Sequence, residues 1–97
     1  MKYSLVIRDK AFSELEDAYS WYEQQQKGLG ELFLSEFKEY SKIIQSSPES
    51  FEKKYKDFRE LLLKTFPYFI VYQIDKNTVV VFSVFHTSRN PKRKYKG

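Results

Sequence analysis

The sequence lacks cysteine altogether and has a single histidine, which narrows the chemistry open to it. Without cysteine there is no disulfide and no thiolate metal site, and a zinc or iron site would need an unusual, carboxylate-dominated ligand set. We therefore expect no metal and no cofactor. Apolar runs stay far below the roughly 18 residues of a membrane span, and no secretory h-region follows Met1 and Lys2. We expect a cytoplasmic protein that does not contact membranes.

Glycine is also scarce, with three residues in the chain. Gly28 and Gly30 fall between two helical patterns rather than after a strand, so no phosphate-cradling loop is predicted. A catalytic carboxylate pair is not predicted either. The acidic residues of the first half are interleaved with apolar ones and indicate solvated helix faces; they are Glu14, Glu16, Asp17, Glu31, Glu36 and Glu39.

Positive charge is concentrated in the second half of the chain. Residues 51–97 contain eleven Lys or Arg against four Asp or Glu, whereas residues 1–50 contain six against nine. This asymmetry indicates a polyanion or an acidic protein as the partner of the second half. Hydrophobic residues make up 41% and aromatic residues 19% of the 97 residues, which is typical of a globular chain. We expect one domain over residues 1–97, because a chain of this length does not support two cores.

Two helical patterns follow a short first strand. Residues 3–7 are β-branched or aromatic, and Asp9 is a good N-cap for the helix that follows. After a break at residues 27–30 a second helical pattern runs to Pro48, where helical geometry is disfavoured. The spacing predicts an αα-hairpin whose apolar residues are Ala11, Phe12, Leu15, Ala18, Tyr19, Tyr22, Leu29, Leu32, Phe33, Phe37, Tyr40 and Ile44.

Beyond Pro48 the apolar period changes to that of strands. Residues 58–63, 69–74 and 79–85 each fit a strand, and the short turn at residues 75–77 makes the last two antiparallel. Strict alternation predicts one face with Val79, Val81 and Phe85 and an opposite face with Val80, Phe82 and Val84. We predict an α+β fold of order β-α-α-β-β-β: an N-terminal strand, an αα-hairpin, and a three-strand antiparallel meander with the hairpin on one sheet face.

Residues 58–91 carry three short motifs in a fixed order. Arg59 leads an apolar strand, Phe66-Pro67-Tyr68 turns into the next one, and Val84-x-His86-x-x-Arg89 closes the hairpin. This arrangement resembles the RelE/ParE superfamily of bacterial type II toxins. The resemblance implies a toxin that a cognate antitoxin neutralises in a hetero-oligomeric complex. RelE-like members cleave messenger RNA on the ribosome, whereas ParE-like members bind DNA gyrase and block replication.

Two features favour the ParE-like function. The ending over residues 84–89 looks closer to the ParE type, and the strands carry Leu, Val, Ile and Phe where RelE-like nucleases place Lys and Arg. DNA gyrase is then the expected target, and the protein is not an enzyme. Two alternatives stay open: a metal-independent, ribosome-dependent mRNA endonuclease that inhibits translation, and a non-catalytic basic module that binds nucleic acid.

The nuclease alternative assigns roles to four side chains. His86 is the one side chain suited to proton transfer near neutral pH, and Arg59 and Arg89 would clamp a phosphate. Tyr95 would stack on a base or orient the phosphate. The competing interpretation of His86 is a hydrogen-bonded structural residue at the end of a strand.

Two further sets of residues are predicted to meet partners. The target or nucleic acid is expected at the basic residues Lys53, Lys54, Lys56, Lys92, Arg93 and Lys94. The antitoxin is expected to cover an apolar surface with a segment of acidic and apolar residues. That surface is predicted at Tyr68, Ile70, Tyr72, Val80 and Phe82.

Overall fold

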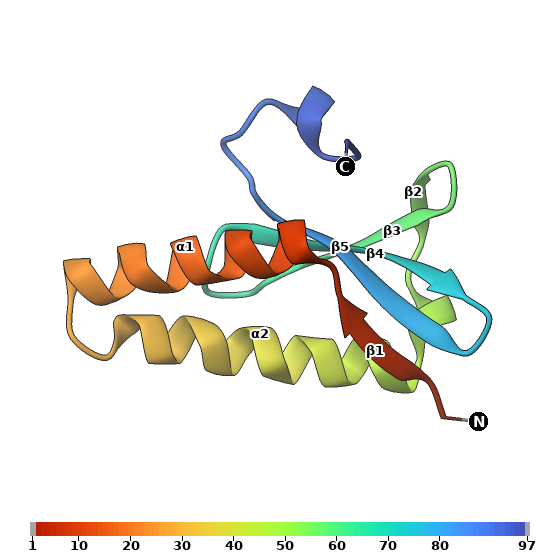
Figure 1. The fold of residues 1–97 in the computed structure, drawn as a ribbon, viewed down its shortest axis with the longest axis horizontal. Helices are drawn as coiled ribbons and strands as arrows, with labels where there is room; N and C mark the ends of the chain where they lie inside the picture. The colour runs from red at the N-terminus through yellow and green to blue at the C-terminus, as the bar shows by residue number, and fades with distance from the viewer. Residues whose placement is uncertain (1, 97) are drawn as a thin grey trace.

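The computed structural model describes residues 2–96 and contains one five-stranded sheet with a helical hairpin on one face (Figure 1). In chain order the elements are β1 (Ser4–Ile7), α1 (Asp9–Gln25), α2 (Leu29–Ser46), the 3₁₀ turn η1 (Pro48–Ser50), β2 (Lys53–Tyr55), β3 (Phe58–Leu62), β4 (Tyr68–Asp75), β5 (Thr78–His86) and the 3₁₀ turn η2 (Pro91–Arg93). The strand order is β1-β5-β4-β3-β2, with β1 parallel to β5 and the other pairs antiparallel. The predicted α+β class and its order of elements are confirmed.

The helical hairpin differs from its prediction at the start of α1, and a carboxylate fixes its turn. Asp9 is the first helical residue and Arg8 occupies the N-cap without a side-chain bond, so the predicted cap is wrong; an acid in the first turn still favours the helix dipole. At the turn, Gly28 adopts a left-handed φ of 91°. The Glu23 carboxylate accepts the backbone N–H groups of Gly28 and Gly30, each at 2.9 Å. One carboxylate therefore fixes the sharp return between the helices.

The main core lies between the helices and the helix-covered face of the sheet. It joins Ala11, Leu15, Ala18, Phe33, Phe37 and Ile44 of the hairpin to Ile70, Tyr72, Val79, Val81 and Val84 of the sheet. The buried Tyr72 hydroxyl donates to the carbonyl of Pro48 at 2.6 Å, and burial raises the pKa of Tyr72 to about 12. This bond ties the end of the hairpin to the middle of the sheet.

A β-bulge in β5 overturns the predicted alternation of that strand. Val71 pairs with Ser83 and Tyr72 pairs with Val81, so Phe82 is an extra residue without a partner in β4. The side-chain phase therefore changes at Phe82. Val84 joins the helix-side core, and Phe85 joins Phe82 on the opposite, open face. The prediction had exchanged Val84 and Phe85.

The edge strand β2 was not predicted. Its three residues, Lys53 to Tyr55, are exposed and pair antiparallel with β3 after a turn in which Lys56 has a left-handed φ of 50°. A short, lysine-bearing strand is a common way to end a sheet without inviting further pairing. At the other hairpin, β4 and β5 each extend beyond their predicted ends and leave only Lys76 and Asn77 as the turn.

Candidate functional site: the open face of the sheet and the C-terminal segment

The open face of the sheet carries a second apolar cluster. Phe58, Val71, Phe82 and Phe85 are buried there, with Phe69 and Tyr95 packed against them. No helix of the hairpin belongs to this cluster. Instead residues 87–96, called here the C-terminal segment, leave β5 and fold back on the side away from α2 (Figure 1).

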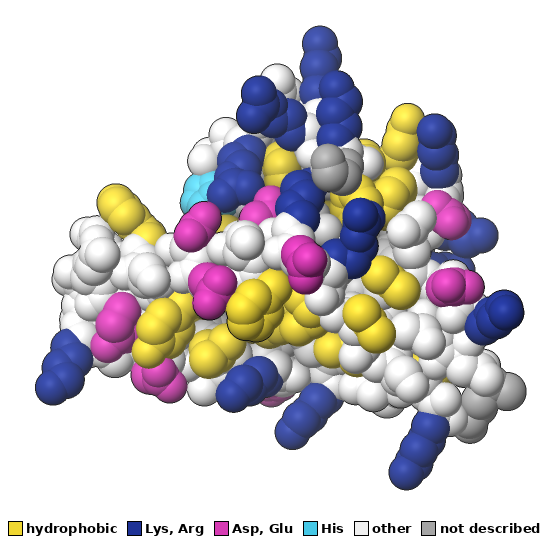
Figure 2. Space-filling view, in the orientation of Figure 1, with side chains coloured by type: hydrophobic (Ala, Val, Ile, Leu, Met, Phe, Trp, Pro, Cys, Tyr) yellow, Lys and Arg dark blue, Asp and Glu magenta, His cyan; other side chains and the backbone are white. Residues whose placement is uncertain are grey.

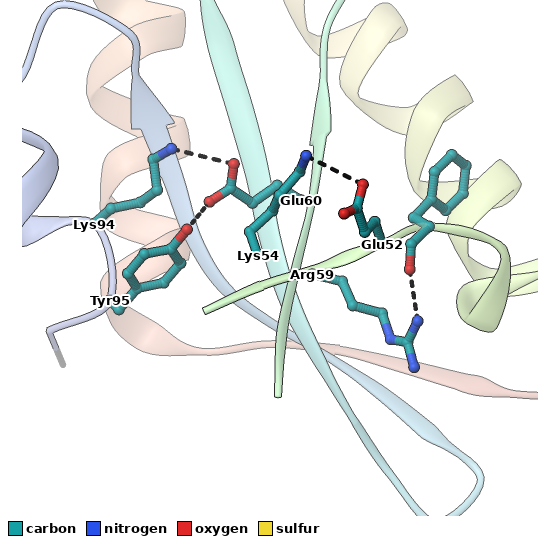
Figure 3. A network of polar contacts seen from close by, with 7 residues as sticks. Glu52, Lys54, Arg59, Glu60, Lys94 and Tyr95 are labelled. Carbon is teal, nitrogen blue, oxygen red and sulfur yellow. Dashed lines mark hydrogen bonds and ion pairs between the residues drawn. The ribbon is translucent and has the colours of Figure 1, made fainter. Parts of the chain in front are cut away.

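Glu60 of β3 anchors the C-terminal segment to the open face. Its Oε1 accepts from Lys94 Nζ at 3.1 Å, and its Oε2 accepts from the Tyr95 hydroxyl (Figure 3). The Glu60 side chain is 6% exposed and that of Lys94 14%. Burial, together with the hydrogen bond to Glu60 and its charge, raises the pKa of Tyr95 above its ordinary value, so this hydroxyl stays protonated and donates.

Aromatic packing extends the same contact toward the sheet edge. The Tyr95 ring stacks on Tyr55 with centroids 4.8 Å apart and lies 5.1 Å from Phe58, while Lys94 Nζ sits 3.8 Å from the centre of the Phe69 ring. Beside these rings is a groove of about 590 Å³. It is lined by Tyr55, Lys56, Phe58, Pro91, Lys92, Tyr95 and Lys96.

Glu14 of α1 fixes the other end of the C-terminal segment, which sequence reasoning missed. Its Oε2 accepts from Arg89 at 3.0 Å. Its Oε1 accepts from the Val84 backbone N–H at 3.0 Å and from Ser83 Oγ at 2.9 Å. Glu14, which the sequence pattern predicted to face solvent, therefore links α1 to β5 near its bulge and to the first turn of the segment.

His86 ends β5 and is engaged in local contacts. Its ring stands nearly perpendicular to Tyr68 at 4.9 Å, and its Nδ1 accepts from the Ser88 backbone N–H at 3.0 Å. Because Nδ1 accepts from an amide, the neutral ring carries its proton on Nε2. These contacts fit the structural interpretation of His86.

Arg59 is held by backbone carbonyls. Its Nη1 donates to the carbonyl of Phe51 at 2.5 Å, the bond drawn from Arg59 in Figure 3. It also donates to the carbonyl of Glu49 at 3.3 Å. The guanidinium thus pins the chain between η1 and β2. A phosphate would have to compete with these bonds.

Of the four residues assigned to nuclease chemistry, Arg89 lies beside His86, where its backbone N–H donates to the His86 carbonyl at 3.1 Å, but Arg59 and Tyr95 lie elsewhere. Arg59 lies opposite Tyr72 and His86 lies opposite Tyr68, so they are four residues apart along β4 and separated by about 13 Å in that direction. Both share the face of their helix-side partners, whereas Tyr95 packs on the open face. The arrangement has no common point at which a phosphate would meet all four groups.

Some of the cations predicted to bind the target are exposed without a partner among residues 2–96, and others are held in ion pairs. Lys92 and Arg93 are exposed, and their side chains make no hydrogen bond or ion pair to the described residues 2–96. Lys94 is committed to Glu60, and Lys54 pairs with Glu52 at 3.4 Å. Figure 2 shows Lys and Arg side chains gathered around the C-terminal segment.

Two N-terminal cations also reach the open face, which the sequence did not indicate. The guanidinium of Arg8 and the ammonium of Lys10 each lie 4.9 Å from the centre of the Phe82 ring. Lys10 Nζ also donates to the backbone carbonyl of Lys96. The positive surface is therefore built from both ends of the chain.

Comparison with known proteins assigns the family. The family model described as the ParE toxin of the type II toxin-antitoxin system parDE matches residues 5–91. This chain belongs to the ParE toxin family. A solved structure titled chromosomal ParDE TA system from P. aeruginosa has the same fold, with a TM-score of 0.80, 15% sequence identity, and coverage of 90% of this chain and 98% of that one. A comparison with curated protein sequences gives no significant match.

In this ParE-type fold the residues predicted for antitoxin binding do not form one surface, which corrects that expectation. Tyr68, Ile70 and Tyr72 are buried in the core under the helices. Phe82 is buried in the open-face cluster, and Val80 is half-buried. The alternation of β4 sends its even-numbered side chains to the helices, so they are already covered by the chain itself.

Much of the exposed apolar surface of the ParE-type toxin lies instead on the helical hairpin. A groove of about 310 Å³ between α1 and α2 is lined by Phe12, Leu15, Tyr19 and Leu34, with Glu16 and Glu31 among its lining residues. Phe12 is 50% exposed, and Leu32, the residue after Glu31 on α2, is 62% exposed. Such a patch on a small protein usually marks a partner site.

The described residues contain neither a cluster that could hold a metal ion nor a helix that could span a membrane. Across residues 2–96 no group of three His, Cys, Asp or Glu side chains is placed to hold a metal ion. Within the same range, none of the helices is both long enough and apolar enough to cross a membrane.

Proposed function

We propose that this ParE-type toxin binds DNA gyrase and blocks replication in the cytoplasm, and that it acts by binding rather than by cleaving RNA. The observation that carries this proposal is the separation of Arg59 and His86 along the sheet, with Tyr95 on the other face. Cleavage of RNA needs a base, an acid and charge stabilisation around one phosphate. Binding needs only a complementary surface, and the exposed cations of the C-terminal segment supply one.

The test is to induce the protein in a bacterium and to follow DNA and protein synthesis separately. We expect DNA synthesis to stop first, and we expect purified protein to inhibit supercoiling by gyrase. His86→Ala should leave this inhibition nearly unchanged, because its contacts are structural. Replacing Lys92 and Arg93 by glutamate should weaken it, because both side chains are exposed and pair with no other residue between 2 and 96. Normal supercoiling in the presence of excess wild-type protein would refute gyrase as the target.

We propose further that a cognate antitoxin neutralises the protein by filling the apolar groove between α1 and α2. The acidic residues Glu16 and Glu31 at this groove favour a segment that combines apolar and basic side chains. Phe12→Ser should weaken antitoxin binding while the growth arrest is retained. The matched control is Ile43→Ser, since Ile43 is also exposed on the hairpin but does not line the groove. Equal losses in both variants would contradict this assignment.

The nuclease and nucleic-acid-binding alternatives draw support from one feature, the groove beside Tyr95. Its aromatic rings and the side chains of Lys56, Lys92 and Lys96 are the groups that stack on bases and pair with phosphates. The same induction experiment separates these alternatives from gyrase binding. An arrest of protein synthesis accompanied by cleaved messenger RNA would favour the nuclease. Binding of single-stranded RNA by the protein, without an arrest of growth, would favour the nucleic-acid-binding module.

A further inference from the structure

Glu60 is an unusual residue in its part of the chain. Residues 51–97 contain four acids, and three of them, Glu52, Asp57 and Asp75, are exposed. The Glu60 side chain is only 6% exposed on the open face of the sheet, and it uses both carboxylate oxygens, one for Lys94 and one for Tyr95. Such a carboxylate must be paired and hydrogen-bonded, because taking a charge out of water is otherwise unfavourable.

The C-terminal segment depends on such side-chain anchors for its position. The backbone bonds of residues 90–96 are local: the N–H groups of Arg93, Lys94 and Lys96 donate to carbonyls three residues earlier. A single 3₁₀ turn of this kind does not persist in water on its own. The segment is attached through Glu60 and through the bond from Lys10 to the Lys96 carbonyl at one end, and through the bond between Arg89 and Glu14 at the other.

We propose that Glu60 is a positioning residue, which holds the C-terminal segment so that the exposed cations Lys92 and Arg93 face the target of the toxin. This inference rests on the proposed function in one respect, that the segment meets the target. Lys92 and Arg93 directly precede the anchored pair of Lys94 and Tyr95, so fixing that pair also fixes where their positive charges lie. Glu60 touches no target itself.

The sign of a charge change distinguishes positioning from plain electrostatics. Glu60→Leu removes a negative charge from the basic half. If only total charge mattered, the variant would bind an acidic or nucleic-acid target more tightly. If Glu60 positions the segment, the variant binds more weakly, since the apparent dissociation constant rises as the competent conformation becomes less populated. A fall in that population to a tenth weakens binding about tenfold.

The matched control is Glu52→Leu. Glu52 is the same residue type, lies near the same sheet edge, and has a side chain that is 78% exposed, so its removal changes the net charge equally without releasing the segment. Tyr95→Phe is a second test, because it removes one bond to Glu60 and leaves the charge unchanged. Each variant is compared with the wild type at equal soluble protein level.

Two measurements decide the proposal. Amide hydrogen exchange at Arg93, Lys94 and Lys96 should accelerate at least about tenfold in Glu60→Leu while the sheet core stays protected. The toxin level that halves the growth rate should rise at least about tenfold in Glu60→Leu, and it should stay equal or fall in Glu52→Leu. Growth arrest reports target binding whatever the target is. A failure of the wild type to inhibit gyrase would therefore refute gyrase as the target but would not contradict the positioning role of Glu60.

Wild-type exchange in Glu60→Leu would overturn the proposal, and so would toxicity equal to that of Glu52→Leu. If Glu60→Leu does not fold, Tyr95→Phe carries the test. A folded Tyr95→Phe protein with faster exchange in residues 93–96 supports the positioning role, and one with unchanged exchange overturns it.

Discussion

Replacing Glu14 by alanine should destabilise the protein far more than an exposed helix glutamate would suggest. The carboxylate accepts the backbone N–H of Val84, which is buried at the bulge of β5. Leaving such a group without a partner costs about 1–3 kcal/mol. The ion pair to Arg89, whose side chain is 45% exposed, adds at most about 1 kcal/mol. We expect Glu14→Ala to lower the free energy of unfolding by about 1–4 kcal/mol.

Urea unfolding measures this loss, with Glu16→Ala as the matched control because Glu16 is exposed on the same helix. Glu14→Gln separates the two contributions: the amide oxygen still accepts from Val84, while the charge that holds Arg89 is gone. It should cost no more than about 1 kcal/mol. A Glu14→Ala protein within about 0.5 kcal/mol of Glu16→Ala would refute the bridging role.

Three further predictions concern stability. Gly30→Ala should destabilise the hairpin in urea although alanine favours helices, because the new Cβ would lie 2.7 Å from the carbonyl oxygen of Tyr19; a more stable variant would contradict this. Tyr72→Phe should cost about 1 kcal/mol near neutral pH. Because burial raises the pKa of Tyr72 to about 12, the wild type should also lose stability relative to this variant as the pH rises from 10 toward 12. Burial alone would raise the pKa of Glu36, but hydrogen bonds from Thr65 and the neighbouring backbone N–H groups lower it. The wild type should therefore lose stability relative to Glu36→Gln as the pH falls below the ordinary glutamate pKa. Parallel pH profiles of stability for the two proteins would contradict this prediction.

Sequence reasoning located the elements of the fold because their signals are local. Apolar spacing marked both helices, Pro48 marked the end of the second, and the turn after Asp75 marked the last hairpin. The edge strand β2 escaped because its three residues include no buried apolar side chain. A strand that exposes every residue leaves no hydrophobic period to detect.

The candidate site was less predictable, because its contacts join residues far apart in the chain. The positions of Lys92 and Arg93 in an exposed basic segment agree with the charge pattern of the sequence. The anchors do not follow from it: Glu60 meets Tyr95 across 35 residues, and Glu14 meets Arg89 across 75. A glutamate between apolar residues has the same pattern whether it faces solvent or accepts bonds from another element.

The bulge at Phe82 connects these hidden features. Apart from Ser83, residues 79–85 are all apolar. The sequence pattern therefore does not show where the strand changes the face to which its side chains point. With strict alternation Val84 would lie on the open face and Phe85 under the helices. The extra residue exchanges them, and Phe85 then completes the aromatic cluster against which Lys94 and Tyr95 pack. Glu14 binds the backbone of Val84, two residues after the bulge, and Arg89 in the first turn of the C-terminal segment with the same carboxylate, so one side chain holds both the strand that carries the bulge and the segment that carries the cations.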